Sequence, residues 1–366
     1  MESLNNKIKS IMQKAGIPYL DVCCSKENDV IYRFISDGAT GKETLAMFSM
    51  SKPITSICAM TLVEEGKFSL DDLVEDYLPE IKNAFTIKDG VKTPVKNKMT
   101  IRHLFTMTGG FNYRTITPSI TALKEKTNHT ANLRDLISAF VQEPLEFEPG
   151  ERFLYSLCLD VLAGVVEVVT GKKFSQVVKE RIFDPLEMNN SSFDNSITDY
   201  APYYIVNEDN KIVSDKVNMW PWITPNYESG GAGLVSTVED YVKFAKMLAN
   251  GGVGENGVRV IGEKALGEVA SPQIDKVSVN NQFTCIQGDD YSYGLGMRVR
   301  TVDTPWGLPK GEFGWDGALG SYLLVDPKNK FSIVMGMHLG NWVKVFKTGH
   351  LQIVEQIYKE LKAQIL

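Results

Sequence analysis

Residues 48–56, "FSMSKPITS", place two serines, Ser49 and Ser51, close to one lysine, and these groups can make up a nucleophile and its base. Pro53 is tolerated only in the first turn of a helix, because it lacks an N–H and clashes in a helix interior. A helix is therefore expected to start near Ser49. On it, Lys52 lies three residues after Ser49 and on the same face, whereas Ser51 points elsewhere. Ser49 is the predicted nucleophile and Lys52 its base.

The start of a helix favours this chemistry. Backbone N–H groups there lack partners within the helix and, with the positive end of the dipole, stabilise negative charge on a nucleophile or oxyanion. A lysine, with an ordinary pKa of about 10.4, becomes an effective base when burial or a nearby cation lowers that pKa. The S-x-x-K pattern alone is weak, since it arises by chance about once in a chain of this size, and a serine here could simply cap the helix.

The elements around this stretch predict a sheet formed by both ends of the chain. Runs at 19–25 and 29–36 predict a hairpin, and strand patterns return at 291–300, 319–325 and 331–338. The middle is mostly helical, with helices expected at 133–141, 156–171 and 174–183. Ser236 and Glu239 have the spacing of a capping box before a further helix that stops at Gly251. Amphipathic helices are expected at both ends of the chain, around 4–12 and from about 349.

The predicted fold class is α/β plus all-α. An antiparallel sheet built from both chain ends is flanked by the terminal helices, and a helical domain is inserted between its two parts. A length of 366 residues suggests about two domains. The predicted boundaries are 1–62 together with 226–366 for the sheet domain and 63–225 for the helical domain. The active site is expected at their interface.

Composition restricts the expected partners. The net charge of −6 and the lack of a Lys/Arg block argue against nucleic acid. The N-terminal stretch has no continuous apolar segment of the kind that a signal peptide needs, and membrane attachment is unsupported. Adjacent Cys23 and Cys24 would point to opposite faces of a strand, so the five cysteines do not predict a disulfide framework. A cytoplasmic protein with a small-molecule substrate is expected.

Other catalytic motifs are missing from the sequence. The four histidines show no H-E-x-x-H spacing and the cysteines no paired ligand spacing, so neither a metal site nor a cofactor is predicted, and His338 is expected to be structural. No G-x-S-x-G occurs, which argues against an α/β-hydrolase. The glycines of "SGGAG", residues 229–233, do not follow a phosphate-loop pattern and are expected to form a tight turn that lines the site.

Several stretches carry a family resemblance. Ser49-Met50-Ser51-Lys52 resembles the S-x-x-K motif of the serine β-lactamase and penicillin-binding-protein superfamily. Ordered segments between about 45 and 338 resemble its class C β-lactamase-like branch, and most of all the esterase-like (family VIII carboxylesterase) members: "MTIRHLFTMTGG", "FEPGERFLYSLCLDVLAGVVEVVTGKKF", "RIFDPLEMNNSSF", "SGGAGLVSTVEDYVKFAKMLANGG" and "YSYGLGM". The resemblance implies a two-domain fold with the nucleophile at the domain interface and an acyl-enzyme intermediate.

The resemblance implies roles for further residues. Tyr155 matches the tyrosine of the Tyr-x-Asn motif, which would face Ser49 and Lys52 and relay the serine proton to the leaving group. Leu157 stands where the asparagine would be, and it cannot donate a hydrogen bond to a substrate amide. A literal Lys-Thr-Gly at 347–349 precedes a helix and is rejected as the third motif, because that motif belongs on a sheet strand.

Residues 315–317 have the strand context of the third motif and resemble its Trp-Gly-Gly variant. Gly317 would allow close approach of the substrate, and the N–H of Ala318 would join that of Ser49 in an oxyanion hole. Trp315 offers an apolar wall where relatives that bind carboxylates have a cation, and Asp316 adds a negative charge. Both substitutions are expected to disfavour anionic substrates.

The predicted function is hydrolysis of a carboxylic ester, or transfer of its acyl group, through an acyl-enzyme. A β-lactamase, a D-alanyl-D-alanine carboxypeptidase or a D-aminopeptidase on the same scaffold is the alternative, and a binding protein that has lost catalysis is a further one. The sequence leaves open the acyl group, the choice between hydrolysis and transfer, and the oligomeric state.

Overall fold

The main sheet joins the two ends of the chain. The computed structural model describes residues 1–193, 200–209, 211–215, 223–274, 278–279, 288–340, 345 and 349–366. Its largest sheet has the strand order β11-β12-β13-β14-β15-β1-β2, and all neighbours are antiparallel. β1 from the N-terminal part pairs with β15 from the C-terminal part, with Asp21 opposite Gly336. The predicted fold class is confirmed.

The strands of the main sheet are three to seven residues long, within the usual range for globular proteins. The main sheet comprises β1 (Asp21–Lys26), β2 (Asp29–Ile35), β11 (Tyr291–Tyr293), β12 (Arg298–Arg300), β13 (Phe313–Asp316), β14 (Tyr322–Asp326) and β15 (Phe331–Gly336). Smaller sheets pair β3 (Leu45–Phe48) with β9 (Leu234–Ser236), β4 (Phe85–Lys88) with β5 (Val91–Pro94), and β6 (Arg152–Phe153) with β10 (Ser278–Val279). In a further sheet, β7 (Tyr203–Val206) lies between β8 (Ile212–Asp215) and β16 (Leu339–Gly340) and pairs with both.

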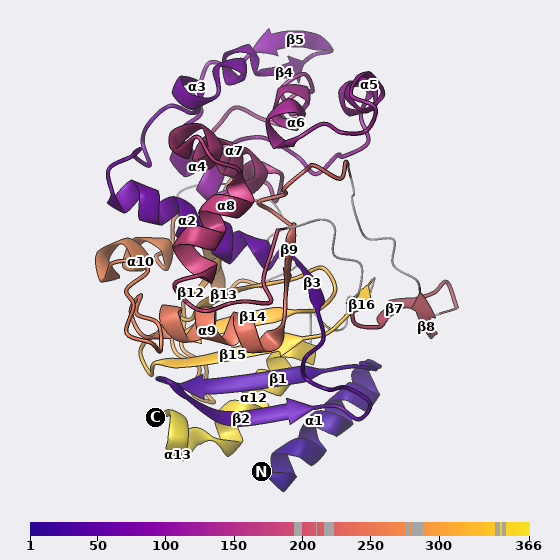
Figure 1. The fold of residues 1–366 in the computed structure, drawn as a ribbon, viewed down its shortest axis with the longest axis vertical. Coiled ribbons are helices and arrows are strands. Elements are labelled where there is room, and N and C mark those ends of the chain that lie inside the picture. The colour runs from indigo at the N-terminus through magenta and orange to yellow at the C-terminus, as the bar shows by residue number, and fades with distance from the viewer. Residues whose placement is uncertain are drawn as a thin grey trace.

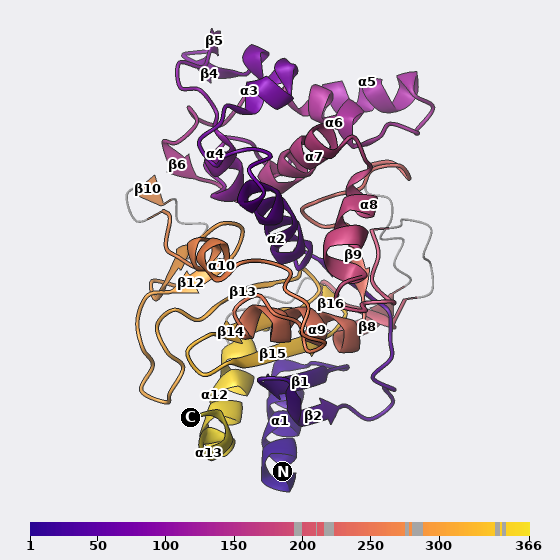
Figure 2. The ribbon, with the colours of Figure 1, turned by 60° about the vertical axis from the view of Figure 1, so that its left-hand side comes forward.

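The helices form two groups around the sheet (Figures 1 and 2). Terminal helices α1 (Glu2–Ala15), α12 (His350–Glu360) and α13 (Lys362–Ile365) lie on one side, and α9 (Val238–Ala249) packs on the other. Beyond α9 lie α2 (Ser51–Glu64), α3 (Val74–Tyr77), α4 (Ile101–Phe105), α5 (Pro118–Lys126), α6 (Leu133–Phe140), α7 (Cys158–Thr170), α8 (Phe174–Val178) and α10 (Glu263–Val269). A 3-10 turn covers Pro79–Asn83, and a π turn at Lys179–Phe183 extends α8.

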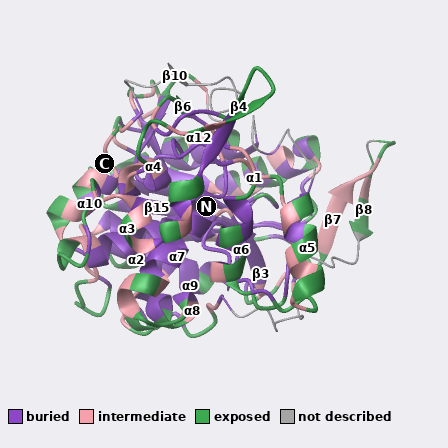
Figure 3. Cartoon of the chain, turned by 90° about the horizontal axis from the view of Figure 1, so that it is seen from above, coloured by how far each residue is buried: buried purple, intermediate pink, exposed green. Residues whose placement is uncertain are grey.

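α2 occupies the centre of the molecule because nearly all of its side chains are apolar or small. All residues from Ser51 to Leu62 are buried, and the helix packs against α7 and α10. Seen from above, α2 and α7 fall in the buried interior, whereas the β7–β8 hairpin projects from the side (Figure 3). Pro53 is the third residue of α2, where a missing N–H costs no internal hydrogen bond.

Two local predictions are wrong. α9 is capped by Thr237, whose hydroxyl accepts from the N–H of Asp240 at 3.1 Å, so the N-cap lies one residue after the predicted Ser236 and the predicted capping box with Glu239 is wrong. The predicted strand at 291–300 is a hairpin of β11 and β12. Its turn includes Gly296, whose φ of 86° is open to glycine but strained for most other residues.

The predicted domain boundaries stay a prediction. β7 and β8 belong to the predicted helical domain by sequence, yet they pair with β16 from the C-terminal part. Among the described residues, no helix is long and apolar enough to span a membrane.

Candidate active site

Ser49 lies in the sharp turn between β3 and α2. Phe48, the last residue of β3, has a φ of 47°, a left-handed conformation that is uncommon for a bulky residue. Residues 49–50 form the turn and α2 begins at Ser51, two residues later than predicted. Ser49 is partly exposed, whereas the residues on both sides of it are buried. The turn therefore presents the Ser49 hydroxyl near the N-terminal end of α2.

Lys52 is fully buried and turns its amine toward Ser49. Its Nζ lies 3.2 Å from Ser49 Oγ, 2.8 Å from the hydroxyl of Tyr113 and 2.7 Å from the carbonyl oxygen of Gly231. Three acceptors match the three N–H groups of an ammonium, which is what a buried cation requires. The structure thus brings the predicted nucleophile and base into contact.

Ser51 has a different environment. Its hydroxyl donates to the carbonyl of Phe48 at 2.6 Å and accepts from the N–H of Leu234 at 2.9 Å. Ser51 is completely buried, and both contacts tie α2 to β3 and β9. Its position fits a structural role rather than that of a nucleophile.

The turn at 229–233 carries the Gly231 carbonyl to Lys52. Thr55, one helical turn after Lys52, donates to the carbonyl of Gly230 at 2.6 Å. Glycine is required at both positions by close packing on α7. A Cβ on Gly230 would lie 2.6 Å from the carbonyl oxygen of Leu159, and a Cβ on Gly231 would lie 2.5 Å from Asp160 Oδ2. The predicted tight turn thus packs directly against the base.

Tyr155 lies over Lys52 without a direct hydrogen bond to it. The ammonium nitrogen is 4.6 Å from the centre of the Tyr155 ring, within the range of a cation–π contact. The Tyr155 hydroxyl accepts from the indole N–H of Trp315 at 3.1 Å, and the two rings are 5.5 Å apart. Tyr113 continues this row of rings, with its centre 5.4 Å from that of Tyr155. The structure therefore brings Tyr155 and Trp315 to Lys52, but Tyr113 is the tyrosine that bonds the amine.

Asp316 does not act as an isolated negative charge, which corrects the expectation from the sequence. Its Oδ1 lies 3.5 Å from the guanidinium of Arg298 and 3.6 Å from Nδ1 of His350. Arg298 is buried, bonds Glu312 at 3.2 Å and packs on the ring of Tyr322. Because Arg298 offsets the charge of Asp316, repulsion of anionic substrates by this residue is weakened.

Leu157, Gly317 and Ala318 take up positions that only partly match the expectation. Leu157 is buried in the hydrophobic core at the start of α7. A Cβ on Gly317 would lie 2.5 Å from the carbonyl oxygen of Met47, so this glycine is needed for the approach of β13 to β3. That contact places the end of β13 beside the segment that carries Ser49, and Ala318 follows as an exposed turn residue.

Sequence reasoning missed Tyr113 and Asp160. Burial raises the pKa of Tyr113 well above its ordinary value, and the neighbouring Tyr155 and Asp160 act in the same direction. Asp160 is fully buried in the first turn of α7, a helix otherwise made almost entirely of apolar residues. The sequence did offer a signal for Asp160, because a carboxylate within an apolar helix is rarely fully buried unless it is paired or hydrogen-bonded.

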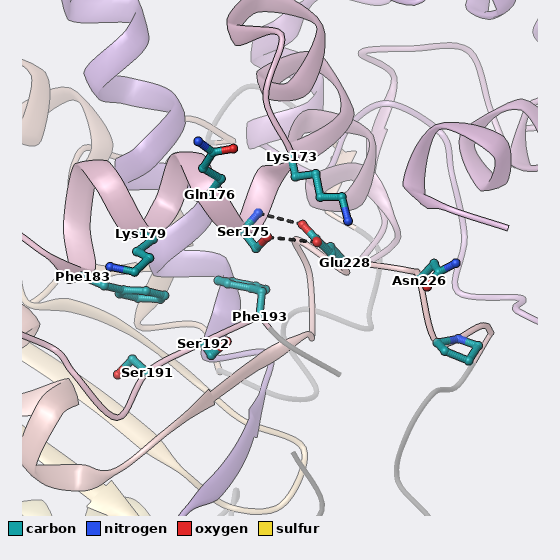
Figure 4. Close-up of a pocket in the computed structure, with 11 residues that line it drawn as sticks. Lys173, Ser175, Gln176, Lys179, Phe183, Ser191, Ser192, Phe193, Asn226 and Glu228 are labelled. Carbon is teal, nitrogen blue, oxygen red and sulfur yellow. Dashed lines mark hydrogen bonds between the residues drawn. The ribbon is translucent and has the colours of Figure 1, made fainter. Parts of the chain in front are cut away.

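A cavity of about 510 Å³ lies apart from Ser49, between α8 and the segment that leads into the 229–233 turn (Figure 4). Glu228 points across it and accepts from the N–H of Ser175 at 2.7 Å and from its hydroxyl at 2.9 Å. These bonds satisfy the N-terminal end of α8. They also anchor the chain one residue before the turn that reaches Lys52.

The described residues hold no group of three or more His, Cys, Asp or Glu side chains that could bind a metal ion. Of the rejected Lys-Thr-Gly triplet, residues 347 and 348 lie outside the described residues, and Gly349 directly precedes α12.

Comparison with known proteins decides the family. A family model described as Beta-lactamase matches residues 4–356. The chain belongs to the beta-lactamase family. This is a hydrolase family, and the resemblance seen in the sequence is confirmed. Protein Rv1367c of Mycobacterium tuberculosis is 28% identical over 82% of this chain and 79% of its own.

Solved structures share the fold at low identity. EstCE1, described as a hydrolase with promiscuous acyltransferase activity, is 24% identical, with a TM-score of 0.79 over 98% of this chain and 99% of its own. A D-stereospecific amidohydrolase from Streptomyces is 19% identical, with a TM-score of 0.72 over 96% of this chain and 97% of its own. At these identities the family members show a common fold alone.

Proposed function

We propose that this chain cleaves carboxylic esters through an acyl-enzyme on Ser49. Ser49 Oγ transfers its proton to Lys52 Nζ as it attacks the acyl carbon, and the bond to the alcohol breaks when the tetrahedral intermediate collapses. The Tyr155 hydroxyl donates its proton to the departing alcohol oxygen and regains one from the Lys52 ammonium, so that the base is neutral again. Water then attacks the acyl carbon and gives a proton to the same Lys52–Tyr155 pair; when the bond to Ser49 Oγ breaks, the pair returns that proton to the serine and the acid is released.

Backbone amides supply the remaining electrostatic assistance. The N–H of Ser49, at the N-terminal end of α2, and the N–H of Ala318, after β13, are the proposed donors to the developing oxyanion. The close packing of Gly317 on β3 supports this pairing, because it holds the two segments side by side. The ring of Tyr155, 4.6 Å from Lys52 Nζ, stabilises the ammonium that forms during attack.

The observation that carries the ester assignment is the contact between Trp315 and Tyr155. Relatives that bind carboxylate-bearing substrates place a cation on this strand, whereas here an indole fills the position and holds the Tyr155 hydroxyl at 3.1 Å. Leu157 offers no hydrogen bond to an amide.

The test is covalent labelling. A fluorophosphonate should modify the wild-type chain at Ser49, Ser49→Ala should lose the adduct, and Ser51→Ala should keep it, with mass spectrometry of the digest locating the label. Ser51→Ala is the matched control, because it also removes a serine hydroxyl, two residues later at the start of α2. An adduct on Ser51 would overturn the assignment, and no adduct on any serine would favour the non-catalytic alternative.

Substrate comparison separates the enzyme classes. Short-chain nitrophenyl esters should be turned over faster than nitrocefin by the wild-type chain. The opposite order would favour the β-lactamase alternative. Turnover of D-alanyl peptides tests the carboxypeptidase alternative, and turnover of D-amino acid amides tests the D-aminopeptidase alternative.

A further inference from the structure

The base in the proposed mechanism must be held in one orientation. A neutral lysine amine has two N–H bonds and one lone pair, and only the lone pair can take the serine proton. Lys52 Nζ has two short contacts, to Gly231 at 2.7 Å and to Tyr113 at 2.8 Å, and a longer one of 3.2 Å to Ser49. If the two short contacts hold the two N–H bonds, the lone pair faces Ser49.

Tyr113 accepts from Lys52 only if its own O–H points elsewhere. Asp160 lies close to the phenol oxygen, since a Cβ placed on Gly231 would be 3.2 Å from the Tyr113 hydroxyl and 2.5 Å from Asp160 Oδ2. Asp160 Oδ2 is buried and has no hydrogen-bond partner in the described part of the chain. An unpartnered buried carboxylate oxygen is costly, so its position calls for an explanation.

The other carboxylate oxygen of Asp160 fixes the turn that holds Lys52. Oδ1 accepts from the hydroxyl of Ser229 at 2.5 Å, from that of Tyr227 at 2.6 Å and from the N–H of Gly231 at 3.3 Å. On the outer side, Glu228 anchors the same segment to α8 (Figure 4). The carbonyl of Gly231 is thereby held from both directions.

We propose that Asp160 and Tyr113 are positioning residues that orient Lys52 as the general base for Ser49. Asp160 holds the Gly231 carbonyl through Oδ1, and through Oδ2 it turns the Tyr113 O–H dipole so that the phenol oxygen faces Lys52. Its negative charge also favours the ammonium that forms when Lys52 takes the proton. This inference rests on the proposed function, and it adds a role for two residues outside the S-x-x-K and tyrosine motifs.

The decisive variants are Tyr113→Phe and Asp160→Asn, which keep shape and remove one function each. Tyr113→Phe should lower kcat for a nitrophenyl ester by about 10- to 100-fold and change KM by less than about threefold, because the loss is one of orientation. Asp160→Asn keeps an acceptor at Oδ1 but removes the charge. It should lower kcat and also move the acidic limb of the pH–rate profile to lower pH, because the ammonium loses its stabilising partner.

Matched controls separate this role from general packing. Tyr358→Phe removes a buried phenol that donates to Asp326 at 2.9 Å, remote from the proposed machinery, and should leave kcat unchanged. The other titratable groups around the Tyr113 hydroxyl are Tyr155, Tyr227 and Tyr293. All three remain in each variant, so a shifted profile reports on the residue that was changed.

The outcomes distinguish this inference from the proposed function. If the wild-type chain is not acylated at Ser49, the proposed function fails and this inference fails with it. If Ser49 is acylated and both variants keep the wild-type kcat and pH profile, only the positioning roles are wrong. A lower kcat with an unmoved profile in Asp160→Asn would mean a structural role alone and would overturn the proposal. Tyr113→Phe decides the orientation step independently if Asp160→Asn does not fold.

Discussion

Replacing His338 with glutamine should remove a pH-dependent part of the stability of this protein. His338 is buried, its Nε2 accepts from the N–H of Ala46 in β3 at 2.9 Å, and its Nδ1 lies 3.2 Å from the carbonyl oxygen of Ala201. The ring is therefore neutral with its proton on Nδ1. A glutamine side chain offers one acceptor and one donor as well, so the variant can keep both contacts but cannot titrate.

The direction and size of this change in stability follow from the pKa of His338. Burial lowers the pKa of His338 from 6.5 to about 4, so the unfolded chain binds this proton at a higher pH than the folded one. Its contribution to stability is complete above about pH 6.5 and is lost as the pH falls toward 4. Over that window the loss is about 3 kcal/mol, as an order of magnitude.

The assay is urea unfolding of both chains at pH 7 and at pH 4. The free energy of unfolding of the wild type should fall by about 3 kcal/mol more than that of the variant. The quantity to compare is the difference between the wild type and the variant in this loss. Burial raises the pKa of Asp21 to about 7, so Asp21 adds stability as the pH falls, and it does so equally in both proteins. Parallel losses in the two chains would refute the neutral, buried His338 and its role in holding β3.

Two further substitutions test the site. Gly317→Ala places a Cβ 2.5 Å from the carbonyl of Met47, and it should destabilise the fold by about 1–3 kcal/mol and lower kcat for esters by moving β13 away from β3; unchanged kcat would argue against Ala318 as an oxyanion donor. Trp315→Lys, with Asp316 retained, should raise kcat/KM for nitrocefin relative to a nitrophenyl ester by about 10- to 100-fold. Circular dichroism checks that each variant folds, and an unmoved ratio would show that Trp315 does not set specificity.

The spacing of apolar, capping and turn residues along the sequence was enough to predict the architecture. Of the predicted apolar stripe at Leu4, Ile8, Ile11 and Met12, all but the half-buried Ile11 are buried in α1. Gly171 ends α7 in the left-handed conformation, as the sequence indicated. These features depend on residues within one or two turns of each other. Errors arose at element ends, as at Thr237, where neighbouring residues are equally able to cap a helix.

The candidate site was predictable only in part. Ser49 and Lys52 are three residues apart, so the turn that leads into α2 brings them together. Tyr113 meets Lys52 across 61 positions of sequence, and no spacing rule links a tyrosine in one loop to a lysine in a distant helix. Asp160 did carry a local signal, because a carboxylate on an apolar helix face must find polar partners, but the sequence could not name Tyr227 or Ser229 as those partners.

The charge at Asp316 shows why a site cannot be judged from its own residues alone. On the sequence it stood beside Trp315 as a second reason to exclude anionic substrates. In the sheet, Arg298 lies on the adjacent strand, opposite Gly314, and its buried guanidinium reaches both Asp316 and Glu312. Removing Asp316 would take one of the two carboxylates from the buried guanidinium of Arg298, so its main effect would be on this ion cluster. We therefore expect any exclusion of anionic substrates to depend on the indole of Trp315, which bonds Tyr155, more than on Asp316.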